Sequence, residues 1–187
     1  LGKDKLWDEL IEFPSIQFGM EMAFLFLQSK SLFELFPSEF TESKKNMLIN
    51  GLVWMGEEQF MKTQIEEKLA QGFSCIKLKI GAIDFDKELG LLRFIRQNFD
   101  AKTIEIRVDA NGAFNSNEAL SKLNQLNEFE LHSIEQPIKA NQIQEMKLLC
   151  HQTPFPIALD EELIGVFGIE KKRKLLEEIQ PQYIILK

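Results

Sequence analysis

The most constraining feature of the chain is a repeated alternation of strand-like and helix-like segments, with a charged residue near the end of each strand. Lys79, Asp109, Glu135, Asp160 and Lys187 mark the repeat, and they are separated by 30, 26, 25 and 27 positions. A strand, a helix and two short loops need about this many residues. Parallel barrels place catalytic groups at the carboxyl ends of successive strands. The spacing therefore predicts one active site built from several strand ends.

Six strands and five intervening helices are expected from the periodicity. Strand-like runs cover 47–54, 75–81, 103–110, 131–136, 156–161 and 183–187, and helical patterns cover 57–72, 84–99, 116–129, 142–152 and 168–180. Such alternation indicates an α/β fold, a parallel sheet with helices outside it. We predict a partial TIM-like (β/α) barrel. A complete barrel needs eight strands and about 250 residues, so we expect the 187 residues to be part of a longer protein.

Two domains are expected along the chain. Residues 1 to about 40 are rich in phenylalanine, and Pro14 is a plausible helix start. A polar stretch at 36–46 leads to the first predicted strand. We therefore predict a helical segment at 1–45 and a barrel domain at 46–187, which holds strands one to six.

Charged residues on the inner face of the predicted sheet indicate function. In the second strand, isoleucine and leucine alternate with Lys77 and Lys79, so both lysines face away from the helices. In the third strand, Asp109 and Asn111 share the inner face. Parallel strands covered on both faces are normally near-continuous apolar runs. A buried charge is costly unless it is paired or bound to a metal, so these exceptions predict a site.

Composition narrows the partners and the compartment. The net charge of −7 and a pI near 5.0 argue against nucleic acid or an anionic membrane as a partner. Cys75 and Cys150 are too few for a disulfide scaffold, and with the two histidines they lack zinc-site spacing. No signal peptide or membrane-spanning segment is evident, so a cytoplasmic protein is expected. Trp54 and the phenylalanines are expected in the core.

Four motifs carry a resemblance to a known family. The segments KLK at 77–79, RVDANGAF at 107–114, SIEQPI at 133–138 and ALDEEL at 158–163 resemble the enolase superfamily. More narrowly, the chain resembles the ortho-succinylbenzoate synthases of menaquinone biosynthesis. That resemblance implies a (β/α)7β barrel closed by a capping domain, with residues 1–45 in the capping region and the barrel truncated after strand six.

The resemblance also assigns roles to the charged residues. Asp109, Glu135 and Asp160 match metal ligands, and three carboxylates without a nearby His or Cys favour Mg²⁺ over zinc. Lys79 matches the base that removes a proton next to a carboxylate, and a dication together with Lys77 would disfavour its ammonium form. Lys77 would polarise the substrate carboxylate. The remaining positions are Lys187, which would stabilise the enediolate as a cation, and Asn111 and Glu161, which would be auxiliary.

Three functions remain open at this point. The first is a Mg²⁺-dependent lyase that dehydrates a succinyl-hydroxycyclohexadiene carboxylate to ortho-succinylbenzoate. The second is a dipeptide epimerase or N-acylamino acid racemase, because these enzymes share the framework of lysines and acids. The third is an inactive partial barrel that associates through its open edges as a homo-oligomer. The first two take a small carboxylate as substrate.

Overall fold

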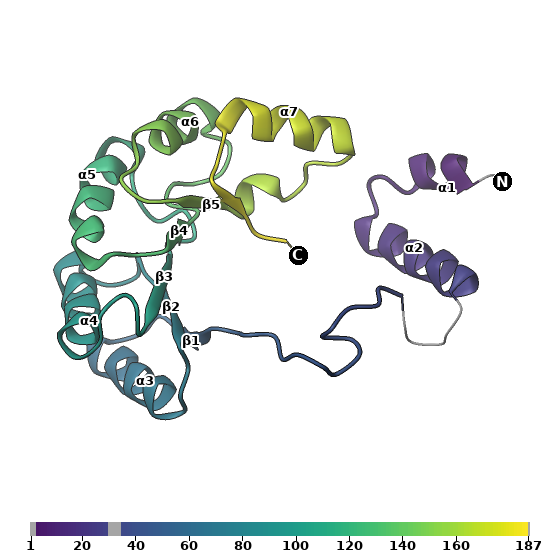
Figure 1. The fold of residues 1–187 in the computed structure, drawn as a ribbon. Coiled ribbons are helices and arrows are strands. Elements are labelled where there is room, and N and C mark those ends of the chain that lie inside the picture. Colours follow the sequence, from purple (N-terminus) through teal and green to yellow (C-terminus); the bar gives the residue numbers. More distant parts are fainter. Residues whose placement is uncertain (1–2, 30–34, 187) are drawn as a thin grey trace. The chain divides into compact units, whose positions relative to one another are not determined.

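The computed structural model describes residues 3–29 and 35–186 (Figure 1). The chain divides into two compact units. One comprises Leu1–Leu48 with Phe167–Ile169, and the other comprises Ile49–Val166 with Glu170–Lys187. No helix among the described residues is long and apolar enough to cross a membrane.

The first unit contains helices α1 (Lys3–Glu9) and α2 (Pro14–Gln28). Pro14 occupies the first turn of α2, where its missing N–H costs no hydrogen bond. The helical segment was expected to continue to residue 45, but residues 35–50 contain no helix. Within this stretch, the Ser38 N–H donates to Thr41 Oγ1 at 2.8 Å and the Thr41 N–H donates to Ser38 Oγ at 3.2 Å. Such side-chain bonds compete with helix formation.

The second unit is built on a parallel sheet in which the strands follow the order of the chain. Every predicted strand is present, although each is shorter than expected. The strands are β1 (Gly51–Val53), β2 (Cys75–Lys79), β3 (Glu105–Asp109), β4 (Ser133–Glu135), β5 (Ile157–Leu159) and β6 (Tyr183–Ile184). Sequential parallel order confirms the partial barrel.

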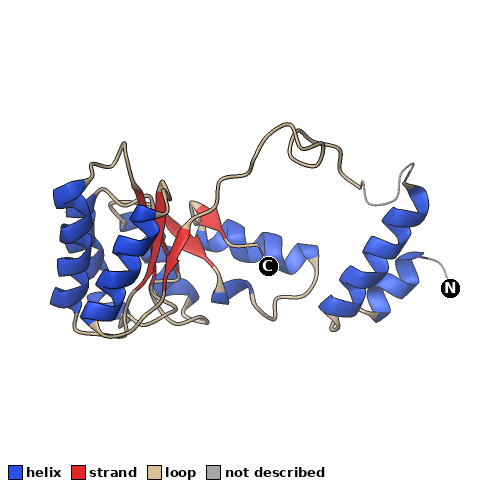
Figure 2. Ribbon diagram, turned by 90° about the horizontal axis from the view of Figure 1, so that it is seen from below, coloured by secondary structure: helices blue, strands red, loops and turns tan. Residues whose placement is uncertain are grey.

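Five α-helices connect the strands and cover one face of the sheet, which curves as an arc inside them in Figure 1. Figure 2 shows the strands between helices in a second view. Asp84 caps α4 by accepting from the Asp86 N–H, and Asn115 caps α5 by accepting from the Asn117 N–H. The helices are α3 (Glu58–Ala70), α4 (Phe85–Asn98), α5 (Ser116–Leu126), α6 (Ile143–Gln152) and α7 (Ile169–Ile179), with short 3₁₀ turns η1 (Asn127–Phe129) and η2 (Glu161–Leu163).

The main core lies between the sheet and these helices. Ile76, Leu78, Ile106 and Val108 are buried there, as the alternation of the strands predicts. The expectation that Trp54 and all phenylalanines are core residues is wrong. Trp54 is 57% exposed, and several phenylalanines are exposed as well: Phe13, Phe18, Phe26, Phe36, Phe40 and Phe60. Apolar composition does not reveal which strand lies at a sheet edge, and Trp54 follows the edge strand β1.

Candidate active site

Charged side chains lie at the carboxyl ends of four neighbouring strands of the sheet. Lys79 is the register partner of Asp109, and Asp109 is the register partner of Glu135. Asp160 directly follows β5. The three acids are almost fully buried, with 0%, 5% and 3% of their surface exposed. The structure thus places the three acids that the sequence singled out at the ends of adjacent strands.

Two lysine ammonium groups lie among these acids. Lys79 Nζ donates to Asp109 Oδ2 at 2.7 Å and to Asn111 Oδ1 at 2.8 Å. Lys77 Nζ lies 3.1 Å from Asp109 Oδ2 and also donates to Glu135 Oε2. Asp109 therefore faces both lysines, which offsets part of the cost of burying its charge.

The electrostatics of this cluster follow from burial and pairing. Burial alone lowers the pKa of Lys77, but its hydrogen bond to Glu135 and the charges of Asp109 and Glu135 outweigh burial and raise that pKa. Burial raises the pKa of Glu135, with further contributions from the charge of Asp109 and a hydrogen bond with Asp160, while Lys77 opposes the shift. Crowded carboxylates of this kind favour a compensating cation.

The auxiliary residues join the ends of β3 and β5. Asn111 Nδ2 donates to Glu161 Oε1 at 2.9 Å, and the Asn111 N–H donates to Asp109 Oδ1 at 3.1 Å. Asn111 thereby contacts Lys79, Asp109 and Glu161 together. The remaining predicted site residue, Lys187, lies outside the described residues.

The donor set suits a hard divalent cation. Carboxylate and amide oxygens are what Mg²⁺ prefers, and three buried acids on adjacent strands supply them. Among residues 3–29 and 35–186, no three His, Cys, Asp or Glu side chains converge closely enough to hold a metal ion. Lys77 bridges Asp109 and Glu135 instead. The chemistry of the residues fits Mg²⁺, and ligation requires the lysine to yield its contacts.

The family described as enolase C-terminal domain-like matches residues 61–177 of the chain. The chain belongs to this family. The resemblance that the sequence motifs carried is thereby confirmed. These matched residues include both β2 lysines, the three acids and the auxiliary Asn111 and Glu161.

Individual relatives of this enolase-like chain are similar over part of their length. An o-succinylbenzoate synthase from Desulfotalea psychrophila is 55% identical over 175 residues, which are 94% of this chain and 47% of the relative. A crystal structure of MenC from the same species matches with a TM-score of 0.75 and 54% identity, covering 87% of this chain and 44% of that one. An L-Ala-D/L-Glu epimerase from Francisella tularensis subsp. novicida is 31% identical over 116 residues, 61% of this chain and 31% of the relative. The chain spans less than half the length of these relatives.

Gln136 holds the backbone of Asp160 and Glu162, and the sequence analysis did not identify it as a site residue. Its side chain is fully buried, and its Oε1 accepts from the Asp160 N–H at 3.1 Å and from the Glu162 N–H at 3.2 Å. Its Nε2 donates to Ile138 O at 3.0 Å and to Glu162 Oε2 at 3.3 Å. Gln136 therefore ties the end of β4 to the end of β5. The sequence feature that could have identified it is the position of this glutamine between the proposed ligand Glu135 and Pro137.

Trp54 is a second residue at the site that the sequence analysis misplaced. Its ring centroid lies 5.8 Å from Lys79 Nζ. Its backbone N–H donates to Gln64 Oε1 at 3.0 Å, and its carbonyl accepts from Gln64 Nε2 at 3.1 Å. Its place at the end of a predicted strand was the sequence feature that could have identified it, because the other site residues occupy strand ends too.

A second polar layer lies toward the amino ends of the strands. Arg107 Nε donates to Glu105 Oε1 at 2.7 Å and forms an ion pair with it. Cys75 Sγ donates to the same oxygen at 3.5 Å. Both cysteines are free, and burial raises the pKa of Cys75 to about 11 and that of Cys150 to about 12. A raised pKa leaves little thiolate, so these thiols are poor nucleophiles.

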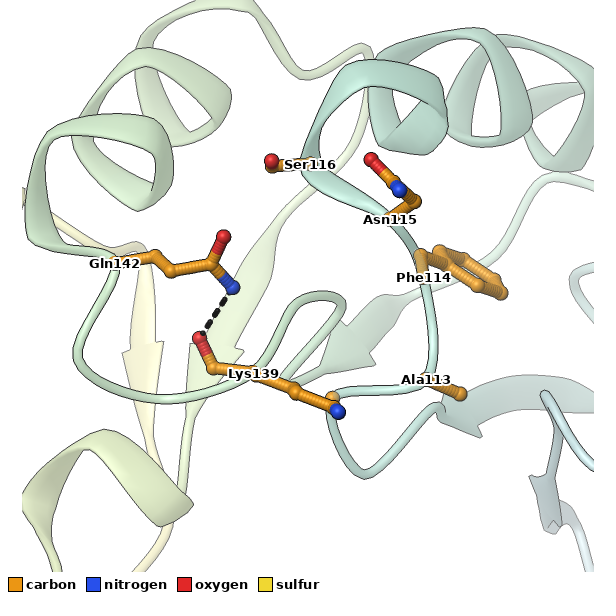
Figure 3. Close-up of a pocket in the computed structure, with 7 residues that line it drawn as sticks. Ala113, Phe114, Asn115, Ser116, Lys139 and Gln142 are labelled. Carbon is orange, nitrogen blue, oxygen red and sulfur yellow. Dashed lines mark hydrogen bonds between the residues drawn. The ribbon is translucent and has the colours of Figure 1, made fainter.

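A separate pocket of about 300 Å³ lies between the loops that follow β3 and β4 (Figure 3). Phe114, Asn115 and Ser116 line it on one side, and Lys139 and Gln142 line it on the other. Gln142 Nε2 donates to the Lys139 carbonyl at 3.0 Å, so both residues of the second loop are partly fixed. None of the acids or lysines of the candidate active site lines this pocket.

Proposed function

We propose that the protein is a Mg²⁺-dependent carbon–oxygen lyase that forms ortho-succinylbenzoate from a succinyl-hydroxycyclohexadiene carboxylate. The observation that carries the proposal is the group of three buried acids flanked by Lys77 and Lys79 at the carboxyl ends of adjacent strands. The 55% identical o-succinylbenzoate synthase supports this reaction over others of the superfamily.

The proposed metal ligands are Asp109, Glu135 and Asp160. Bound Mg²⁺ would neutralise the negative charge that the substrate carboxylate gains when the neighbouring carbon loses its proton. Lys77 keeps its proton and binds the substrate carboxylate. Gln136 holds Glu135 and Asp160 at a fixed separation through its contacts at the end of β5.

Lys79 handles the proton in both steps of the proposed reaction. Its uncharged amine takes the proton from the carbon next to the carboxylate, and the electron pair of the C–H bond moves into the enediolate. The C–O bond to the hydroxyl group then breaks, the hydroxide takes the proton from the Lys79 ammonium, and water leaves as the ring becomes aromatic. Lys187 is proposed to face the enediolate as a fixed cation.

An epimerase or racemase is the second candidate, because the L-Ala-D/L-Glu epimerase from Francisella is 31% identical over 116 residues. In that reaction, Lys79 and Lys187 would serve opposite faces of one carbon. The 31% relative matches 61% of this chain, whereas the synthase matches 94%, so the synthase is favoured.

The domain boundary is part of the proposal. We assign residues 1–45 to the capping region and 46–187 to the barrel. The division into compact units at Leu48 and Ile49 is close to this boundary.

The proposal is tested by two measurements on the full natural protein. Calorimetric titration with Mg²⁺ should give binding that Glu135→Gln removes, and the metal-loaded protein should convert the cyclohexadiene substrate to ortho-succinylbenzoate. Racemisation of an N-acylamino acid or a dipeptide without dehydration would establish the second candidate instead. Absence of Mg²⁺ binding and of both activities in a cooperatively folded sample would overturn both candidate functions.

A further inference from the structure

Trp54 lies on the same face of the sheet as the lysines of the site. Leu52 pairs in register with Lys77, and Val53 pairs with Leu78. Val53 and Leu78 are both fully buried toward the helices. Because side chains alternate along a strand, the next residue, Trp54, faces inward beside Lys79.

The Trp54 side chain is exposed while its backbone is held. The residue is 57% exposed, which is unusual for an indole that has a core available to it. Gln64, on α3, hydrogen-bonds both the N–H and the carbonyl of Trp54. β1 is an edge strand of the described sheet, so the Gln64 side chain supplies the backbone hydrogen bonds that a neighbouring strand would otherwise make. The backbone is therefore fixed with the indole presented at the mouth of the site.

The indole borders the space in front of Lys79 Nζ. The 5.8 Å between that nitrogen and the ring centroid is within the range of a cation–π contact. Any carbon that gives its proton to Lys79 must come close to this nitrogen, and the group bearing that carbon then lies next to the indole. A flat conjugated ring can stack on an indole face, whereas a flexible chain gains less from it.

We propose that Trp54 is a substrate-positioning residue that stacks on the flat ring of a cyclic unsaturated carboxylate and selects it over acyclic amino acid derivatives. The inference rests on the proposed function, since it deepens the substrate preference of the same site. Gln64 contributes by holding the indole in place. Trp54 does not exchange protons.

Fluorescence and kinetics on the full natural protein test this role. This chain contains two tryptophans, Trp7 and Trp54, so the emission change that is lost between a Trp7→Phe parent and the same protein with Trp54→Phe belongs to Trp54. Titration of the Mg²⁺-loaded parent with ortho-succinylbenzoate should quench or shift its emission. Trp54→Leu should raise KM by about tenfold with a smaller change in kcat, as expected for loss of one aromatic stack. Trp54→Phe should fall between Leu and the parent.

Gln64→Glu is the matched positioning variant. It keeps the acceptor for the Trp54 N–H but loses the donor to the Trp54 carbonyl, so KM should rise less than in Trp54→Leu. An active parent whose emission ignores the product, and whose KM is unchanged by both substitutions at Trp54, overturns the inference and leaves the proposed function intact. A folded, Mg²⁺-binding parent without synthase turnover overturns the proposed function, and the inference with it.

Discussion

The centre of the sheet and its two edges are built differently. All residues of β4 and β5 are buried, whereas both residues of β6 are exposed. At the centre, Glu135 and Asp160 have neighbours on both sides, and Gln136 crosslinks the strand ends. At the edges, Trp54 and Tyr183 remain 57% and 46% exposed.

The difference indicates a division of labour within one sheet. Buried carboxylates need fixed partners, because an isolated buried charge is costly, and only strands with two neighbours surround them. An edge strand leaves large side chains open to a ligand or to further chain. The centre of the described sheet therefore holds the fixed charges, and the end of β1 places Trp54 beside them.

The largest effect is expected from removing Lys79, the proposed general base at the centre of the site. Lys79→Ala should lower kcat by about 10²- to 10⁴-fold, which is the usual contribution of a general base. Asp109 keeps its contact with Lys77, so the thermal midpoint should change little. Steady-state kinetics with Lys102→Ala as an exposed control would check this. Retention of full activity would remove Lys79 from the mechanism.

A matched pair of isoleucines measures the packing difference directly. Ile134 on β4 is fully buried, and Ile184 on β6 is 40% exposed. Ile134→Ala should lower the free energy of unfolding by about 2–5 kcal/mol, and Ile184→Ala by about 0.5 kcal/mol. Urea denaturation of both variants would decide. Equal losses would mean that β6 is covered in solution, as in the expected edge-to-edge oligomer.

A substitution of Gln136 separates the effect of carboxylate position on Mg²⁺ binding from the effect of carboxylate charge. Gln136→Leu removes the bonds to the Asp160 and Glu162 N–H groups but no carboxylate, and Mg²⁺ affinity should fall by about 10- to 100-fold. Gln144→Leu is the control, because exposed Gln144 makes a single bond to Glu178. Calorimetric titration should show normal affinity for the control. Unchanged affinity in both variants would show that Asp160 needs no such support.

The buried carboxyl group of Glu88 holds the loop that follows β2. Its Oε1 accepts from the backbone N–H groups of Gly81, Ala82 and Ile83, while its buried Oε2 has no hydrogen-bond partner among the described residues. Burial raises the pKa of this carboxyl above its ordinary value, although the three N–H donors and Lys122 oppose the shift.

The sign of the resulting pH dependence follows by linkage. Because the folded protein binds the Glu88 proton more tightly than the unfolded chain, stability falls as pH rises from the unfolded pKa through the folded pKa. Glu88→Gln cannot titrate. The parent should therefore lose unfolding free energy relative to Glu88→Gln as pH rises above the ordinary glutamate pKa of about 4.3. Urea denaturation of the parent and of Glu88→Gln at several pH values would check this. A difference in unfolding free energy that does not change with pH would mean that the Glu88 pKa is not raised.

Local pattern was sufficient to predict the elements of the barrel. Alternation at Lys77 and Lys79 placed both lysines on the inner face, and the βα spacing placed Asp109 and Glu135 at neighbouring strand ends. Helix and strand periods are local properties, and sequential parallel order follows from them. The predicted helical segment extended too far, because residues 35–50 contain no helix.

The contacts between strands could not be predicted in the same way. That Lys77 reaches past Asp109 to Glu135 depends on side-chain conformation, not on spacing. Gln136 has a positive φ of 39° and turns its amide toward β5, which no local rule for glutamine predicts. Trp54 was assigned to the core because hydrophobicity alone does not distinguish an edge residue from a core residue.

The Asn111–Gly112 pair has a consequence for the chemical ageing of the protein. Asn-Gly sequences commonly deamidate, because the glycine nitrogen attacks the asparagine side-chain carbonyl to close a succinimide ring. Here the Gly112 N–H donates to the Gln136 carbonyl at 2.7 Å, and the Asn111 amide is held by Lys79 and Glu161. The attacking and attacked groups are both engaged elsewhere, so the folded protein should resist this damage and the unfolded chain should not. The rate of deamidation at Asn111 would then measure how often this part of the barrel opens.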